Sequence, residues 1–309
     1  MDPLRNPYTP NAGARPPVIL GRDDQLQTFA LLLARMAAGR TEQSMIITGL
    51  RGVGKTVLLG SFRTEALGQS WVVIDSEVSK HSDDAFRRDL VSDFRTALFE
   101  LSPKARWSDR LKRAASVLRS FSISVDPSGS LTAGVDVAAL EGQADSGNLH
   151  RDLSDLFVAI GEAAQEQGRG VVLLYDEVQF LTQPQLEALI AALHKTVQRG
   201  LPVTLVGAGL PQIAELAGDA KSYAERLFKF PRIGSLSDAD ASRALADPAE
   251  SEGATFSPGA LHLAVELTEG YPYFIQELGY AVWGVAGGPT ITPDDVEAAL
   301  PLYESKLDS

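Results

Sequence analysis

The residues best suited to chemistry lie in a glycine-rich stretch between a predicted strand and a predicted helix. Gly49 to Thr56 reads Gly-Leu-Arg-Gly-Val-Gly-Lys-Thr, which has the spacing Gly-x-x-x-x-Gly-Lys-Thr. Glycines allow backbone N–H groups to turn toward a phosphate, and the N-terminus of the next helix adds a positive dipole. Lys55 can then bridge the β- and γ-phosphates, and the Thr56 hydroxyl can coordinate Mg²⁺. The stretch therefore predicts a phosphate-binding loop (P-loop) for a nucleoside triphosphate.

We expect this loop and the first turn of the following helix to hold the nucleotide phosphates. The predicted binding residues are Gly49, Arg51, Gly52, Val53, Gly54, Lys55, Thr56 and Val57. An Asn-Lys-x-Asp element, which reads guanine, is absent from the sequence, because the only asparagines are Asn6, Asn11 and Asn148. The sequence therefore favours ATP (and ADP), together with Mg²⁺, over GTP.

Two adjacent carboxylates, Asp176 and Glu177, follow the apolar segment Val171 to Tyr175. If that segment is a strand of a parallel sheet, both lie at its carboxyl edge, where open α/β folds bind their ligands. Asp176 would then hold Mg²⁺ through water, and Glu177 would orient or deprotonate the attacking water. A strand that ends in Asp-Glu is by itself usually a turn or a helix cap. The upstream P-loop is what favours the catalytic interpretation.

The hydrophobic pattern predicts the elements that position these residues. Near-continuous apolar segments alternate with amphipathic ones, which indicates a parallel sheet with helices on both faces. The expected strands span residues 44–48, 71–75, 170–175 and 201–206, with a short one near 230–233, and the expected helices span 23–39, 56–67, 85–101, 152–167 and 184–199. Alternating apolar residues around Asp126-Pro127-Ser128-Gly129 predict a β-hairpin at about residues 120–138.

Strand signals stop at about Ser237, and the rest of the sequence predicts helices, which begin after Ser237, at Pro258, at Pro272 and near Thr292. The predicted fold is α/β: a P-loop NTPase αβα sandwich with a parallel five-stranded sheet, an inserted β-hairpin and a small C-terminal helical lid. The expected domains are an extended, proline-rich N-terminal arm (residues 1–17), the αβα domain (18–235) and the lid (236–309).

The composition limits the classes of protein to which the chain can belong. Its 28 Lys and Arg residues against 40 Asp and Glu residues give a net charge of -12, which disfavours a general nucleic-acid clamp because phosphate binding needs cationic surface. The chain has no cysteine, which excludes disulfides and sulfur-ligated zinc, and its four histidines show no metal-ligand spacing. The sequence shows neither a signal peptide nor an apolar stretch of membrane-spanning length. We therefore expect a cytoplasmic protein that binds no membrane.

These segments together resemble the AAA+ ATPases, in the branch shared by replication-initiator (origin-recognition type) ATPases and the STAND signalling ATPases. The resemblance covers about residues 15–300. Gly49 to Thr56 is similar to the Walker A motif, and Leu173 to Glu177 is similar to Walker B. Val18 to Asp23 is similar to a short segment that lines the adenine pocket in this branch, which implies adenine contacts for Leu20, Gly21 and Arg22.

The resemblance also extends to the lid, with two differences. Gly270-Tyr271-Pro272 resembles the Gly-x-Pro turn of the STAND lid, which implies adenine contacts for Tyr271 and Pro272. Gly207 to Pro211 lies where the sensor-1 strand ends in AAA+ proteins, but it lacks the usual Asn, Thr or Arg. The sensor-2 arginine of AAA+ lids is also absent. The missing sensor-2 arginine, together with the Gly-x-Pro turn, favours a nucleotide switch over fast, oligomer-dependent hydrolysis.

The leading hypothesis is a switch that hydrolyses ATP to ADP and phosphate with Mg²⁺, in which Lys55 and Glu177 are catalytic. Ser222 to Phe228 resembles the segment that often carries an arginine finger, which makes Arg226 a third catalytic candidate, although an arginine near a helix end is more often solvated. We expect a protein partner or self-association, and no nucleic acid bound through this region. Two alternatives stay open: a DNA-associated initiator or transposition-helper ATPase, and a regulatory module that binds ATP with little turnover.

Overall fold

The computed structural model describes residues 1–11, 13–79, 82–102, 107–123, 125–128, 130–132, 134 and 137–307. The chain forms two units. The sheet unit comprises Leu26–Thr48 and Ser61–Pro231, and the lid unit comprises Met1–Gln25, Gly49–Gly60 and Arg232–Ser309. None of the helices in the described ranges combines the length and apolar character that a membrane span requires.

The sheet unit contains a five-stranded parallel sheet with the strand order β2-β3-β4-β1-β5. Its strands are β1 (Ser44–Thr48), β2 (Val72–Glu77), β3 (Val171–Asp176), β4 (Val203–Gly209) and β5 (Phe228–Lys229). The register pairs Thr48 with Gly209 and Tyr175 with Gly207, so β1, β3 and β4 end at the same edge. The predicted α/β fold with a parallel five-stranded sheet is confirmed, and the short fifth strand begins two residues earlier than expected.

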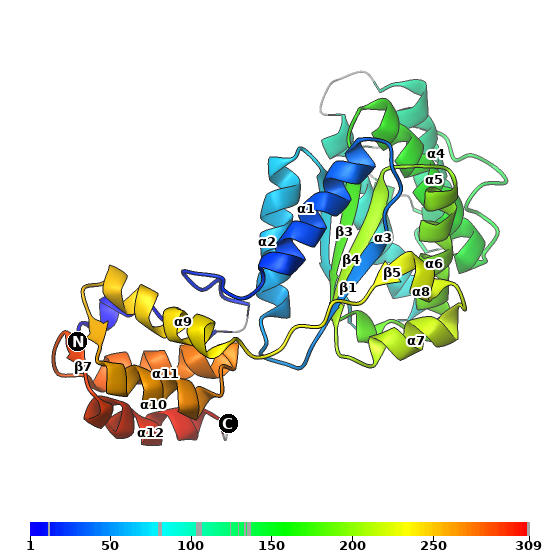
Figure 1. Ribbon diagram of the computed structural model, residues 1–309. Coiled ribbons are helices and arrows are strands. Elements are labelled where there is room, and N and C mark those ends of the chain that lie inside the picture. The colour runs from blue at the N-terminus through cyan, green and yellow to red at the C-terminus, as the bar shows by residue number, and fades with distance from the viewer. Residues whose placement is uncertain are drawn as a thin grey trace. The chain divides into compact units, whose positions relative to one another are not determined.

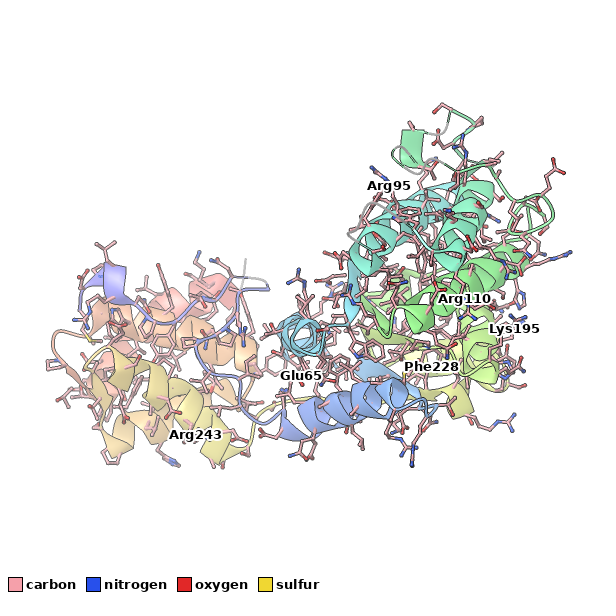
Figure 2. All side chains as sticks on the ribbon, turned by 90° about the horizontal axis from the view of Figure 1, so that it is seen from above. Glu65, Arg95, Arg110, Lys195, Phe228 and Arg243 are labelled. Carbon is pink, nitrogen blue, oxygen red and sulfur yellow. The ribbon has the colours of Figure 1, made fainter. Side chains whose placement is uncertain are left out.

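Helices cover both faces of this sheet (Figure 1). The helices up to β5 are α1 (Asp23–Ala37), α2 (Lys55–Gly68), α3 (Asp83–Leu101), α4 (Asp109–Ile123), α5 (Leu149–Glu166), α6 (Gln183–Gln198), α7 (Ile213–Ala220) and α8 (Ala224–Leu227). On one face Phe29 of α1 and Phe62 of α2 stack with ring centroids 4.4 Å apart. On the other, α3, α5 and α6 share one core with β3 and β4. The exposed side chains of Glu65, Arg110 and Lys195, labelled in Figure 2, mark the solvent faces of α2, α4 and α6.

The predicted β-hairpin at about residues 120–138 is wrong for the residues that the structure describes. Helix α4 continues to Ile123, and Ser130–Thr132 forms a single 3₁₀ turn. Phe121 and Leu118 are fully buried on one side of α4. That helical period outweighs the alternation of Phe121, Ile123 and Val125 in the first of the two predicted hairpin strands, because a short alternation fits either structure. Residues 124, 129, 133, 135 and 136 of the expected hairpin lie outside the described residues.

The lid contains four helices, two of which begin after a serine cap. They are α9 (Asp238–Ser251), α10 (Pro258–Thr268), α11 (Pro272–Val285) and α12 (Pro293–Leu307), accompanied by the two-residue parallel strands β6 (Thr255–Phe256) and β7 (Thr290–Ile291). The side chains of Ser237 and Ser257 accept hydrogen bonds from the backbone N–H groups of the third residues of α9 and α10. These bonds stabilise the N-terminus of each helix. The expected helices are confirmed, whereas the small strand pair was not expected.

The N-terminal segment packs against the lid. The Tyr8 hydroxyl donates a hydrogen bond to the Leu245 carbonyl, and the Trp283 indole N–H donates to the Asp2 carbonyl at 2.9 Å. Tyr8 is 1% exposed and belongs to the lid core. Gly279 makes room for it, since a Cβ there would lie 2.5 Å from the Tyr8 ring. The arm therefore supplies an aromatic anchor to the lid, while the domain limits at residues 17 and 235 stay predictions.

Replacing this anchor should destabilise the lid. Tyr8→Ala removes a buried aromatic ring, so we expect the free energy of unfolding in urea to fall by about 3–5 kcal/mol. Tyr8→Phe keeps the ring and loses only the hydroxyl hydrogen bond, which should cost about 1 kcal/mol. Wild-type stability in Tyr8→Ala would contradict the docking of the arm.

Candidate nucleotide site

The backbone of the P-loop has the conformation that its glycines permit. Gly52 and Gly54 have φ values of +77° and +89°, a region that residues with a side chain rarely adopt. A Cβ at Gly49 would lie 2.6 Å from the carbonyl oxygen of Ile233, so this position requires glycine. Helix α2 starts at Lys55, and the first amides of a helix have no partner inside it. The loop therefore ends on a positive helix terminus suited to an anion.

The Lys55 side chain lies back over the start of the loop. Only 6% exposed, it donates hydrogen bonds from Nζ to the carbonyls of Gly49 at 3.1 Å and Leu50 at 2.8 Å. These charge-assisted bonds hold the ammonium group in one place. Val53 is buried, whereas Arg51 and Thr56 are exposed. The cation predicted to bind phosphate is thus positioned by the loop itself.

Arg22 binds the backbone of the loop and of the lid. Its guanidinium donates to the carbonyls of Gly21 at 2.9 Å, Val53 at 3.1 Å and Gly234 at 2.6 Å, and the side chain is 8% exposed. Burial lowers the pKa of Arg22, and the negative charge of Asp240 opposes that shift. Arginine nevertheless keeps its proton in proteins, so a buried cation is held here by carbonyl oxygens.

The turn before α11 also contacts the P-loop. The Tyr271 hydroxyl donates a hydrogen bond to the Arg51 carbonyl, and the backbone N–H of Tyr273 donates to the Gly52 carbonyl at 3.1 Å. A Cβ at Gly52 would lie 3.0 Å from both tyrosines, which shows how closely the turn packs on the loop. Pro272 is the first residue of α11. The contact of Tyr273 with the loop was not predicted, because Tyr273 makes it through its backbone N–H, and a backbone donor leaves no signal in the residue type.

The lid unit thus gathers most of the predicted binding residues. Gly21, Arg22, Arg51, Gly52, Val53 and Tyr271 are linked by the contacts above, whereas Leu20 packs in the lid core. The predicted adenine contacts of Leu20, Gly21, Arg22, Tyr271 and Pro272 stay predictions. Asp176, Glu177 and Arg226 belong to the sheet unit.

Glu177 has a restrained and unusual conformation. Its φ of +55° is left-handed, which a residue with a side chain keeps only where its surroundings impose it. Its backbone N–H donates to Asp176 at 2.8 Å, and its carboxylate accepts a hydrogen bond from the Gln179 side chain. The amide oxygen of Gln179 in turn accepts from the Leu210 N–H at 3.1 Å, at the end of β4. A role for Gln179 was not predicted. The signal for it in the sequence is an amide side chain two residues after Glu177.

The sheet around Asp176 carries further carboxylates. Burial raises the pKa of Asp75 on β2, with a smaller contribution from the charge of Asp176 and an opposing one from Arg63. On α3, burial and the charges of Asp89 and Asp75 raise the pKa of Asp93 to about 6. Burial, with a smaller contribution from neighbouring negative charge, therefore disfavours the ionised forms of Asp75 and Asp93.

Arg226 lies at the opposite edge of the sheet from Asp176. It is an exposed residue of α8, immediately before β5, and β5 pairs with Ser44 and Met45 at the start of β1. The P-loop follows the other end of β1. A finger role for Arg226 would therefore require a second copy of the chain, and it stays a prediction.

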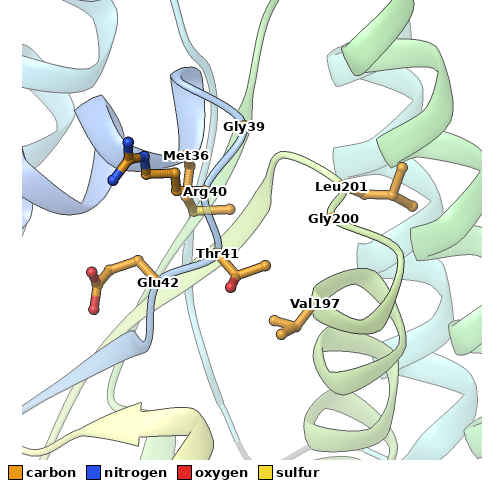
Figure 3. A pocket seen from close by; sticks show the side chains of 8 residues that line it. All are labelled: Met36, Gly39, Arg40, Thr41, Glu42, Val197, Gly200 and Leu201. Carbon is orange, nitrogen blue, oxygen red and sulfur yellow. The ribbon is translucent and has the colours of Figure 1, made fainter.

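The amino edge also carries a small hollow (Figure 3). It is lined by Met36, Gly39, Arg40, Thr41, Glu42, Val197, Gly200 and Leu201. These residues precede β1 and β4, and open α/β folds bind ligands at the carboxyl edge instead. We assign this hollow no part in the nucleotide site.

Comparisons with known proteins agree with the fold. The sequence profile described as the AAA ATPase domain matches residues 18–206. Among curated proteins, none matches the sequence significantly. Similar solved structures include the Orc1 protein of Aeropyrum pernix in complex with DNA, with a TM-score of 0.53 and 15% identity over 93% of this chain and 66% of that chain.

Two more structures have the same fold. Cdc6p from Pyrobaculum aerophilum has a TM-score of 0.56 and 15% identity, over 97% of this chain and 70% of that chain. The Thermotoga maritima RuvB Holliday junction branch migration motor has a TM-score of 0.54 and 14% identity, over 91% and 69%. At these identities the likeness shows the fold alone, and this chain spans about two thirds of each structure's length.

Removing the loop cation tests the nucleotide site. Lys55→Ala deletes the ammonium group held over the loop, so we expect calorimetry with ATP and Mg²⁺ to show at least tenfold weaker binding, roughly 1.4 kcal/mol. Lys195→Ala, on the exposed face of α6, is the matched control and should bind as wild type. Equal affinity of Lys55→Ala and wild type would contradict the assignment.

Proposed function

This chain belongs to the AAA ATPase domain family, as the resemblance to origin-recognition type ATPases predicted, and we propose that it acts as a nucleotide-dependent switch. It binds ATP with Mg²⁺, hydrolyses it to ADP and phosphate, and reports the nucleotide state through its lid. The observation that carries the proposal is the hydrogen bonding of the lid turn at Tyr271 and Tyr273 to the P-loop backbone. A ligand that moves the loop must then disturb the lid.

The P-loop supplies the phosphate contacts. Its amides and the N-terminus of α2 stabilise the negative charge of the β-phosphate, as in other loops that precede a helix. Lys55 adds a full positive charge and is already held at the loop by Gly49 and Leu50. By the resemblance, Leu20, Gly21, Arg22, Tyr271 and Pro272 form the adenine side of the site.

Thr56 and Asp176 are the residues that we assign to a magnesium ion bound together with the nucleotide. Mg²⁺ takes oxygen ligands and in nucleotide sites keeps waters and phosphate oxygens, with only one or two protein ligands. Among the described residues, no three His, Asp or Glu side chains are grouped as a self-sufficient metal site. The exposed hydroxyl of Thr56 and the carboxylate of Asp176, at the end of β3, would supply these one or two protein ligands. When bound, the ion neutralises charge on the phosphates.

Glu177 is the residue assigned to the attacking water. Its left-handed backbone and the Gln179 hydrogen bond fix the direction of the carboxylate. A fixed carboxylate can orient a water molecule and accept its proton. At the end of β4 the donor to Gln179 is a backbone N–H of Leu210, where AAA+ proteins usually have a polar sensor side chain. This difference fits slow turnover.

The DNA-associated alternative draws on the solved structures of this fold. One is a protein in complex with DNA and another is a Holliday junction motor. Against it stands the net charge of -12, since nucleic-acid binding needs neutralising cations. The remaining alternative, a module with little turnover, differs from the switch only in its hydrolysis rate. Self-association or a protein partner is part of the proposal, because Arg226 lies at the amino edge of the sheet, beside the start of β1, whereas the P-loop follows the end of β1.

Glu177→Gln separates binding from hydrolysis. The substitution keeps size and hydrogen bonding while removing the base, so we expect ATP affinity close to wild type and steady-state phosphate release lower by on the order of a hundredfold. Glu65→Gln on the exposed face of α2 serves as the control. If Glu177→Gln released phosphate at the wild-type rate, Glu177 would have no catalytic role.

Binding to random duplex DNA tests the alternative. The acidic surface predicts weak binding at physiological salt by fluorescence anisotropy, because few phosphates would be neutralised. Submicromolar affinity under these conditions would support the DNA-associated function instead.

A further inference from the structure

Three consecutive carbonyl groups of the P-loop accept hydrogen bonds from donors outside the loop. The Arg51 carbonyl accepts from the Tyr271 hydroxyl, and the Gly52 carbonyl accepts from the Tyr273 N–H at 3.1 Å. The Val53 carbonyl accepts from the Arg22 guanidinium at 3.1 Å. These are long-range contacts rather than bonds of a local turn: the donor to Val53 lies 31 positions away in the sequence, and the donor to Arg51 lies 220 positions away.

These bonds fix the direction of the loop amides. A trans peptide is planar, so a carbonyl held on one side places the N–H of the next residue on the opposite side. The three bonds therefore orient the amides of Gly52 and Val53 away from the lid turn and the amide of Gly54 away from Arg22. Positive φ at Gly52 and Gly54 alternates the backbone as in anion-binding nests. The amides expected to meet phosphate are thus set by the donors behind them.

The donors from α11 are well suited to this task. Helix α11 begins with Pro272, which has no N–H, and Tyr271 makes no side-chain cap. The amides of a first helical turn have no partner inside the helix, and that of Tyr273 finds one in the loop. The Tyr271 ring packs against Gly52, where a Cβ would lie 3.0 Å away, so the loop cannot shift without losing this contact.

Arg22 ties the same loop to the strand-to-lid connection. Its Nη2 atom serves both Val53 and Gly234, and the side chain is 8% exposed. A buried guanidinium that lost these carbonyls would be left unpaired, which is costly. The loop conformation and the course of the chain at Gly234 are therefore coupled.

We propose that Arg22 and the Tyr271–Tyr273 turn are positioning residues of the P-loop, and that tight binding of the nucleotide β-phosphate depends on them. This inference rests on the proposed nucleotide function and adds to it the residues that shape the phosphate cradle. It differs from an adenine contact of Tyr271, because the hydroxyl rather than the ring is the acting group.

Tyr271→Phe tests the role of the hydroxyl while keeping the ring. Loss of one neutral hydrogen bond should weaken binding of ADP and of inorganic pyrophosphate by about fivefold in calorimetry, about 1 kcal/mol, and leave adenosine binding unchanged. Tyr280→Phe is the matched control, since Tyr280 lies on the exposed face of the same helix. An unchanged ADP affinity, or an equal loss for adenosine, would overturn the proposal.

A second measurement does not depend on nucleotide. Hydrogen exchange of the Tyr273 amide, which is bonded to the Gly52 carbonyl, should be about fivefold faster in Tyr271→Phe than in wild type or Tyr280→Phe, with exchange in α9 and α10 unchanged. Faster exchange throughout the lid would show general loosening, and unchanged exchange at Tyr273 would show that the hydroxyl does not hold the loop against the turn; either result overturns the inference. If wild type bound no nucleotide, the proposed function would fail while this measurement still decided the positioning role.

Discussion

A loop can direct its N–H groups at one ligand only when its carbonyl groups are satisfied elsewhere, because unpaired buried backbone groups cost free energy. In this chain the satisfying donors are the Tyr271 hydroxyl, the Tyr273 amide at the start of α11, and the guanidinium of Arg22, the residue before α1. The segment Gly49–Gly60 accordingly belongs with the lid by its contacts, although it continues directly from β1 of the sheet. The P-loop is therefore one of the segments through which the chain passes from the sheet unit to the lid unit.

Each unit also has features of its own that bear on the P-loop and its neighbours. The parallel register brings β1, β3 and β4 to one edge, which fixes the origin of the P-loop and the place of Asp176. Glu177 is held in a left-handed conformation by its neighbours. The lid core includes Tyr8 from the arm, so a change at the loop acts on a firmly packed helical body. A rigid body transmits a local change better than a loose one.

Local signals were sufficient for the sheet, the capped helices and the P-loop, because each depends on residues a few positions apart. Ser237 and Ser257 marked helix starts, and the apolar run before Asp176 marked a strand. The predicted hairpin is wrong because its first alternating run, Phe121 to Val125, begins inside the longer helical period of α4. Tyr273, Gln179 and the arm anchor Tyr8 act through backbone groups or through partners distant in sequence. Such contacts leave no periodic pattern, so only the folded chain reveals them.

Hydrogen exchange with and without saturating ATP and Mg²⁺ tests most directly whether the lid responds together with the P-loop when nucleotide binds. Nucleotide should slow exchange at residues 268–276 and at 20–23, together with the P-loop, because the bound loop tightens its bonds to Tyr271, Tyr273 and Arg22. Protection confined to the P-loop, with unchanged exchange at 268–276, would contradict the account and leave the lid as passive packing.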